Sequence, residues 1–153
     1  MGGFNPRERF SSTRLALCPW AAPLVKNEVT ARRGRGPHRV TVNNYGDRWA
    51  AVKLRDESHR TVLALLVAPK STAEVKDFPS GRFRLEYALG ERWSRRCGVF
   101  LDGMQAQRFP DFDEFPVPQR PVGMAVRMEY TITPVFAGNV QAQDVPNEQF
   151  KAE

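Results

Sequence analysis

One compact group of chemically active side chains in this 153-residue chain is the acidic run Asp111, Asp113 and Glu114. Carboxylates on one short loop suit hard cations such as Ca²⁺ and Mg²⁺. The run lacks the glycine and the spaced oxygen ligands of a calcium loop. We therefore favour a loop that its interspersed phenylalanines anchor to a core while the acids stay solvated, and we expect neither a metal nor another cofactor.

Acid–base or nucleophilic catalysis has few candidates. The only histidines are His38 and His59, and neither has a nucleophile or carboxylate at a motif spacing. Ser58 adjoins His59, but adjacent residues do not form a triad. The sequence contains no GxSxG motif, no phosphate loop and no zinc cluster. We expect a protein that is not an enzyme.

Basic residues are concentrated in the N-terminal quarter of the chain. Residues 1–39 hold eight Lys or Arg and two Glu, whereas residues 40–153 hold equal numbers of basic and acidic residues. The Arg-Arg-Gly-Arg-Gly core at 32–36 has too little apolar surface to offset the entropy of ordering, and we predict a largely disordered, Arg-rich tail over 1–39. Flexible arginines bind nucleic-acid phosphates. The candidate nucleic-acid contacts are Arg32, Arg33, Arg35 and Arg39; the alternative is a solvated tail, because no aromatic residues are interleaved.

Three large aromatic residues, Tyr45, Trp49 and Trp93, fall in or beside predicted loops. If the loops gather at one end of a sandwich, these rings are candidate contacts for a protein or carbohydrate partner. The alternative is that the tryptophans cap the ends of the core, because large aromatic side chains are mostly buried.

The two cysteines, Cys18 and Cys97, have no metal-ligand spacing, and we expect free thiols. Residues 15–25 are apolar after a basic start, but Pro19 and Pro23 interrupt them and no clean cleavage site follows. A cytoplasmic location is therefore preferred to secretion. No apolar run approaches the ~20 residues of a membrane span.

Period-two alternation predicts strands through most of residues 40–150. Residues 82–89 alternate after a Pro79-Ser80-Gly81 hinge, as a strand with one buried face does. Residues 61–67 are almost wholly apolar, which indicates a strand buried on both faces. Residues 97–101 and 104–109 are expected to form a hairpin through Asp102-Gly103, and residues 125–136 the longest strand. Eight or nine short strands with regular turns predict an all-β fold, an antiparallel, prealbumin- or Ig-like β-sandwich over 40–150.

Two stretches resemble a known class of module. Residues 52–56 and the turn and strand at 78–85, Phe-Pro-Ser-Gly-Arg-Phe-Arg-Leu, resemble prealbumin-like sandwiches typified by carboxypeptidase regulatory domains. Residues 88–93, 109–115, 130–140 and 148–150 resemble an uncharacterised bacterial domain that occurs alone or beside tetratricopeptide and J-domain modules. The resemblance covers residues 40–150 and implies an accessory or binding role with no carried-over activity. The Arg-rich tail departs from it.

These features together predict a non-catalytic interaction module that binds a protein partner through loops or an exposed sheet edge. The alternatives are a nucleic-acid-associated protein that uses the tail, and an envelope domain that binds carbohydrate.

Overall fold

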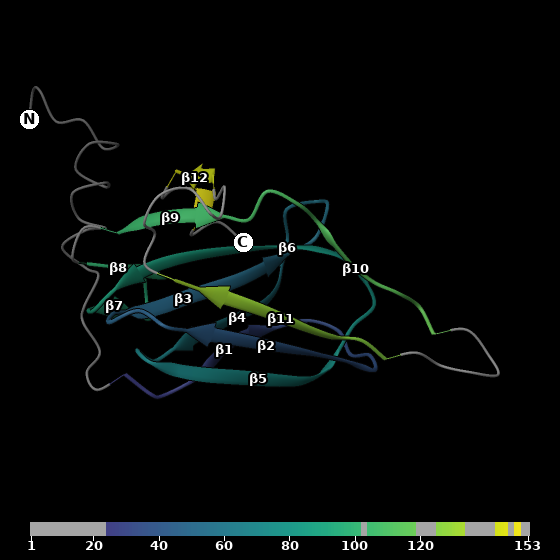
Figure 1. Ribbon diagram of the computed structural model, residues 1–153. Helices are drawn as coiled ribbons and strands as arrows, with labels where there is room; N and C mark the ends of the chain where they lie inside the picture. Colours follow the sequence, from purple (N-terminus) through teal and green to yellow (C-terminus); the bar gives the residue numbers. More distant parts are fainter. Residues whose placement is uncertain (1–23, 102–103, 119–124, 134–142, 147–148, 151–153) are drawn as a thin grey trace, which may run out of the picture.

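The computed structural model describes residues 24–101, 104–118, 125–133, 143–146 and 149–150. Two sheets and a short hairpin account for its strands (Figure 1). The large sheet runs in the order β1 (Val29–Arg32), β4 (Thr61–Val67), β3 (Trp49–Arg55), β6 (Gly81–Gly90), β9 (Gln105–Arg108), β12 (Gln143–Val145), with β10 (Asp113–Phe115) on β6. The small sheet runs β11 (Arg127–Ile132), β2 (His38–Asn44), β5 (Ser71–Phe78), and the hairpin is β7 (Trp93–Ser94) with β8 (Val99–Phe100).

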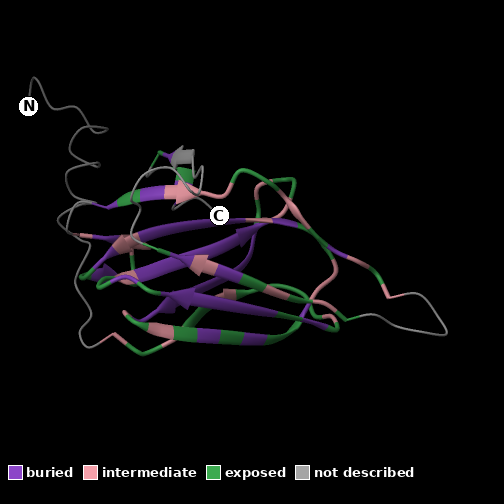
Figure 2. Ribbon diagram, in the orientation of Figure 1, coloured by how far each residue is buried: buried purple, intermediate pink, exposed green. Residues whose placement is uncertain are grey.

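The two sheets pack face to face, which confirms the predicted all-β sandwich. Alternate residues of each sheet meet in one apolar cluster, with Val40 and Val42 from β2 against Leu54 from β3 and Leu65 from β4. β5 shows the alternation as buried and exposed stripes (Figure 2). The ladders are antiparallel except that β11 runs parallel to β2. The structure also divides the chain into more strand segments than the eight or nine predicted, because several are only two to four residues long.

The large sheet is buried on its outer face as well. Ala51, Leu66 and Ala88 point away from the sandwich core and pack in a second cluster with Trp93 and Phe150. This second cover explains why every residue of β4 is buried, as the continuous apolar run at 61–67 predicted. Among the residues that the structure describes, no helix is long and apolar enough to cross a membrane.

Part of the predicted tail belongs to the fold. β1 pairs antiparallel with β4 in the large sheet. Arg32, the last residue of β1, also links the two sheets, because its guanidinium donates to the carbonyl oxygens of Lys76 and Asp77 on β5. Together with the bond from Gly36 N–H to Asp77 O, these bonds tie the edge strand β5 to the segment that contains β1. Residues 1–23 lie outside the described residues, so the rest of the tail stays a prediction.

Two local expectations need correction, and the Pro79-Ser80-Gly81 hinge is present as expected. Residues 99–100 and 105–108 do not pair with each other: β8 pairs with β7, whereas β9 pairs with β6. The strand expected over 125–136 is β11 over 127–132, and 134–142 lie outside the described residues. The Pro79–Gly81 hinge leads from the small sheet to the large one, with Gly81 at a φ of 145° that favours glycine.

Candidate functional site

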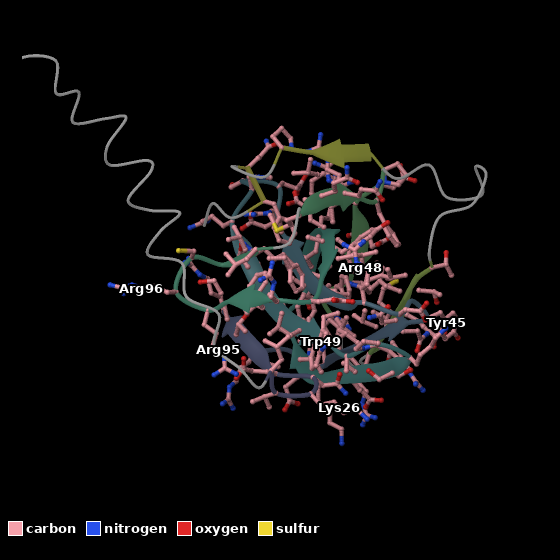
Figure 3. All side chains as sticks on the ribbon, turned by 90° about the vertical axis from the view of Figure 1, so that its left-hand side faces the viewer. Lys26, Tyr45, Arg48, Trp49, Arg95 and Arg96 are labelled. Atoms are coloured by element: carbon pink, nitrogen blue, oxygen red, sulfur yellow. The ribbon has the colours of Figure 1, made fainter. Side chains whose placement is uncertain are left out.

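Four chain segments converge at one end of the sandwich, which we call the basic end: residues 24–28, 45–48, 68–70 and 91–98. The strand registers bring them together, because Asn44 pairs with Ser71, Ala50 with Val67, and Trp49 with Gly90. Figure 3 looks directly at this end, with Trp49 near the centre and Tyr45 and Arg96 towards opposite sides. Loops held by a rigid scaffold are where binding residues concentrate.

Asn44 holds two of these segments in place. Its side chain is fully buried, and Nδ2 lies 2.8 Å from the carbonyl oxygen of Arg48 and 3.2 Å from those of Val67 and Ala68. Its Oδ1 accepts from the Gly46 backbone N–H at 3.0 Å, an Asx turn. One buried amide therefore links the β2–β3 turn to the β4–β5 turn.

Asn27 and Lys70 add hydrogen bonds between the segments of the basic end. Both have positive φ, 57° and 54°, in the left-handed region that a turn requires. Asn27 Nδ2 donates to the Thr72 carbonyl oxygen at 3.1 Å. Lys70 donates from its backbone N–H to Gly46 O at 3.2 Å and from Nζ to Tyr45 O at 3.0 Å. The end of the sandwich is therefore pre-organised by hydrogen bonds between turns.

The three predicted aromatic contacts separate into two kinds. Tyr45 is 54% exposed and borders an open hollow of about 340 Å³ that Lys70, Ser71 and Thr72 complete. Trp49 is half-buried and packs against the second core cluster. Trp93 is buried with its ring 4.9 Å from that of Phe100, so it caps the core rather than facing a partner.

The charge at the basic end is unbalanced. Asp47, Glu28 and Glu91 stand among six basic residues: Lys26, Arg48, Lys70, Arg92, Arg95 and Arg96. Asp47 pairs with Lys70 at 3.3 Å, and Glu28 pairs with Arg95 at 3.1 Å. The guanidinium of Arg48 donates to a neutral acceptor, the Leu89 carbonyl oxygen, at 3.1 Å. Sequence reasoning missed this set because its members are scattered over seventy residues of mostly balanced sequence.

The arginines predicted to contact nucleic acid lie elsewhere. Arg32 is bonded to β5 carbonyl oxygens, and Arg39 lies 3.4 Å from Glu74 in an exposed ion pair. The Arg33 backbone N–H donates to Val62 O, at the end of β4 opposite the basic end. Arg35 is exposed beside it. The structure does not bring these four arginines to the aromatic residues, and their contact with nucleic acid stays a prediction.

The remaining chemical candidates have structural partners. His38 is fully buried in β2, where Nδ1 accepts from Val126 N–H at 3.0 Å and Nε2 lies 2.8 Å from Pro116 O. Asp113 and Glu114, expected on a loop, belong to β10, where Asp113 accepts a hydrogen bond from the Tyr130 hydroxyl at 2.8 Å. Burial, followed by this bond and the Asp113 charge, raises the pKa of Tyr130 well above its ordinary value. Within the described ranges, no three His, Cys, Asp or Glu side chains gather as a metal site requires.

A second polar cluster is buried on the outer face of the large sheet. Arg55 is 1% exposed, and its Nε donates to Glu86 Oε1 at 2.9 Å. Lys53 is opposite Glu86 in the strand register and donates to the Phe150 carbonyl oxygen at 2.6 Å. Glu86 is the only acidic residue on β3, β6 and β9. Nearby, burial and the charge of Arg108 lower the pKa of Arg84.

Cys97 lies between β7 and β8 and is disulfide-bonded. This corrects the expectation of free thiols. The sequence holds one other cysteine, Cys18, which lies outside the described residues.

Comparison with known proteins does not extend these observations. No protein-family model, curated protein or solved structure matches the chain. The function is therefore inferred from the geometry of the basic end.

Proposed function

We propose that this protein is a non-catalytic interaction module that binds a protein partner through the basic end of its sandwich. The observation that carries the proposal is an exposed tyrosine, Tyr45, beside an open hollow on turns that buried hydrogen bonds hold rigid. Exposed aromatic side chains supply much of the energy of protein interfaces at a low entropy cost.

The surrounding features support binding rather than reaction. Lys70, Ser71 and Thr72 around the hollow offer charge and hydroxyl groups for recognition, without a paired nucleophile and base among them. The two histidines do not belong to this end: His38 is at the far end of β2 from Asn44, and His59 lies in the loop between β3 and β4. The basic end therefore combines an aromatic anchor with a polar rim, as interfaces do.

Site-specific photo-crosslinking in cells that naturally make the protein tests the proposal. A photoreactive phenylalanine replaces Tyr45 in one variant and Val117 in a matched control. Val117 is 73% exposed and follows β10, which pairs with the opposite end of β6 from Trp49. We expect a discrete protein adduct from position 45 and none from position 117. Adducts of equal yield from both positions, or none from position 45, would contradict the proposal.

We also infer that the module works in an oxidising compartment, an inference supported by the disulfide at Cys97. Structural disulfides persist in secreted and envelope proteins and are rare in the cytoplasm. Lysing cells directly into a thiol-alkylating reagent, before any reduction, provides the test. We expect Cys97 to escape alkylation in the first step. Full alkylation of Cys97 at that stage would contradict an oxidising compartment and support a cytoplasmic location.

A further inference from the structure

We propose that the occupant of the basic end is an acidic, extended segment of a partner protein. This proposal rests on the proposed function and specifies the chemistry of the partner. It follows from three features of the described residues: uncompensated positive charge, the hydrogen-bonding capacity of the hollow, and the placement of acidic residues within the surface.

The positive charge is available to a ligand. Lys26 and Arg96 are exposed and make no ion pair or hydrogen bond within the part of the chain that the structure describes. They project from separate segments, residues 24–28 and 91–98, and flank the end on two sides (Figure 3). Arg48 projects from a third segment of this end, residues 45–48, and donates to a carbonyl oxygen rather than to a carboxylate. A ligand that carries several separated negative charges matches this arrangement.

The hollow beside Tyr45 offers acceptors for a peptide backbone. Ser71 Oγ donates its hydrogen to Ala68 O at 2.7 Å, and Thr72 Oγ1 donates to Asn43 Oδ1 at 2.7 Å. A hydroxyl group has one hydrogen and two acceptor sites, so each of these oxygens is left with acceptor capacity only. Peptide N–H groups supply the complementary donors, whereas a phosphodiester backbone has none.

Two observations favour a protein segment over a nucleic acid. Asp47 is 87% exposed beside Lys70, where it would repel a closely spaced run of phosphates. Among the described residues of the basic end, Tyr45 is the one exposed aromatic residue, since Trp49 is half-buried and Trp93 is buried. Single-stranded nucleic acids instead use successive stacking platforms. A peptide with spaced carboxylates avoids Asp47 and needs one aromatic contact.

The experiment measures fluorescence anisotropy of the full chain with three labelled probes. These are a twelve-residue peptide that alternates Glu with Ser and Gly, the same peptide with Gln for Glu, and a single-stranded DNA twelve-mer. The test variant is Lys26→Glu with Arg96→Glu. The matched control is Arg35→Glu with Lys76→Glu, which changes the net charge equally at the opposite end, where Gly36 N–H bonds Asp77 O. Both pairs are exposed, so neither should impair folding.

We expect the Glu peptide to bind the wild type and the control alike, and the test variant to bind about tenfold more weakly. Binding should weaken as salt rises from about 0.05 to 0.5 M, and the Gln peptide should not compete. Three results would overturn the proposal: no binding of the Glu peptide, equal loss in both variants, or tighter binding of DNA that the test variant abolishes. If any of these results is found together with a specific crosslink at position 45, the proposed interaction function stands and only the acidic nature of the partner is rejected.

Discussion

The buried pair of Arg55 and Glu86 allows one prediction to be worked out in energy. Replacement of Glu86 by Leu removes the only acidic side chain from β3, β6 and β9 and leaves Arg55, which is 1% exposed, without a charge partner. Loss of one member of a buried ion pair costs about 3–5 kcal/mol. We therefore expect Glu86→Leu to lower the free energy of unfolding by an amount within that range.

The double variant separates charge from packing. Arg55→Met together with Glu86→Leu removes both charges and replaces them with apolar groups, a change that is often near neutral in buried pairs. Here it leaves acceptors without their donor, since Arg55 also donates to His59 O at 3.2 Å and to Gln149 O at 3.0 Å. We expect the double variant to lose roughly 1–2 kcal/mol, less than Glu86→Leu alone, because each unmet hydrogen bond costs on the order of 1 kcal/mol.

Urea unfolding followed by tryptophan fluorescence measures these values. Trp93 is buried in the second cluster, on the same outer face of the large sheet, and so reports on the region that is altered. The slope of free energy against urea must stay unchanged for the comparison to hold. A loss below about 1 kcal/mol for Glu86→Leu would refute the reasoning about uncompensated buried charge. The reasoning would also be refuted if the loss of stability in the double variant equalled the sum of the losses in Arg55→Met and Glu86→Leu, because coupled sites are not additive.

Three further predictions concern other parts of the fold. Burial and the Asp113 bond raise the pKa of Tyr130 above its unfolded value. The contribution of Tyr130 to stability is therefore complete below about pH 10 and is lost as the pH rises beyond that. Circular dichroism should show alkaline unfolding, and Tyr130→Phe should shift this unfolding to higher pH. Gly90→Ala would place a Cβ 2.3 Å from Phe100 Cγ and should cost about 1–3 kcal/mol in thermal or urea unfolding, whereas an unchanged midpoint would show that the β7–β8 hairpin yields freely. Asn44→Ala removes the amide that joins two turns and should cost roughly 2–3 kcal/mol and weaken crosslinking at position 45; intact crosslinking despite the lost stability would show that the turns do not need it.

The sequence by itself determined which residues face inward. Alternation over residues 82–89 predicted the buried positions of Phe83, Leu85 and Tyr87, and the almost wholly apolar run at 61–67 predicted the full burial of β4. The opposite face of β6 was expected to be exposed, but Glu86 and Ala88 on that face are buried. The turn residues also acted locally as expected, with Gly81 at positive φ after Pro79. These properties follow from neighbouring side chains, because a strand exposes successive residues to opposite faces wherever it lies.

Only the tertiary structure decided which strands are neighbours. The edge of a strand presents the same N–H and C=O groups whatever its side chains, so alternation cannot reveal a partner. The parallel pairing of β11 with β2 and the pairing of β9 with β6 were therefore missed. His38 shows the same limit: an Arg- and Gly-rich neighbourhood predicted a tail, but contacts with Pro116 and Val126, about eighty residues away, bury it.

The candidate site divides in the same way. Tyr45 could be predicted as an exposed ring because turn residues surround it, and it is exposed. Trp93 occupies a similar polar stretch but is buried, because β7 and β8 fold over the outer face of the large sheet. Lys26, Arg48 and Arg96 are far apart in the chain and meet at one end through strand registers. Local sequence can therefore set the exposure of a turn residue, whereas a charged surface assembled from four turns exists only after the sheets have packed.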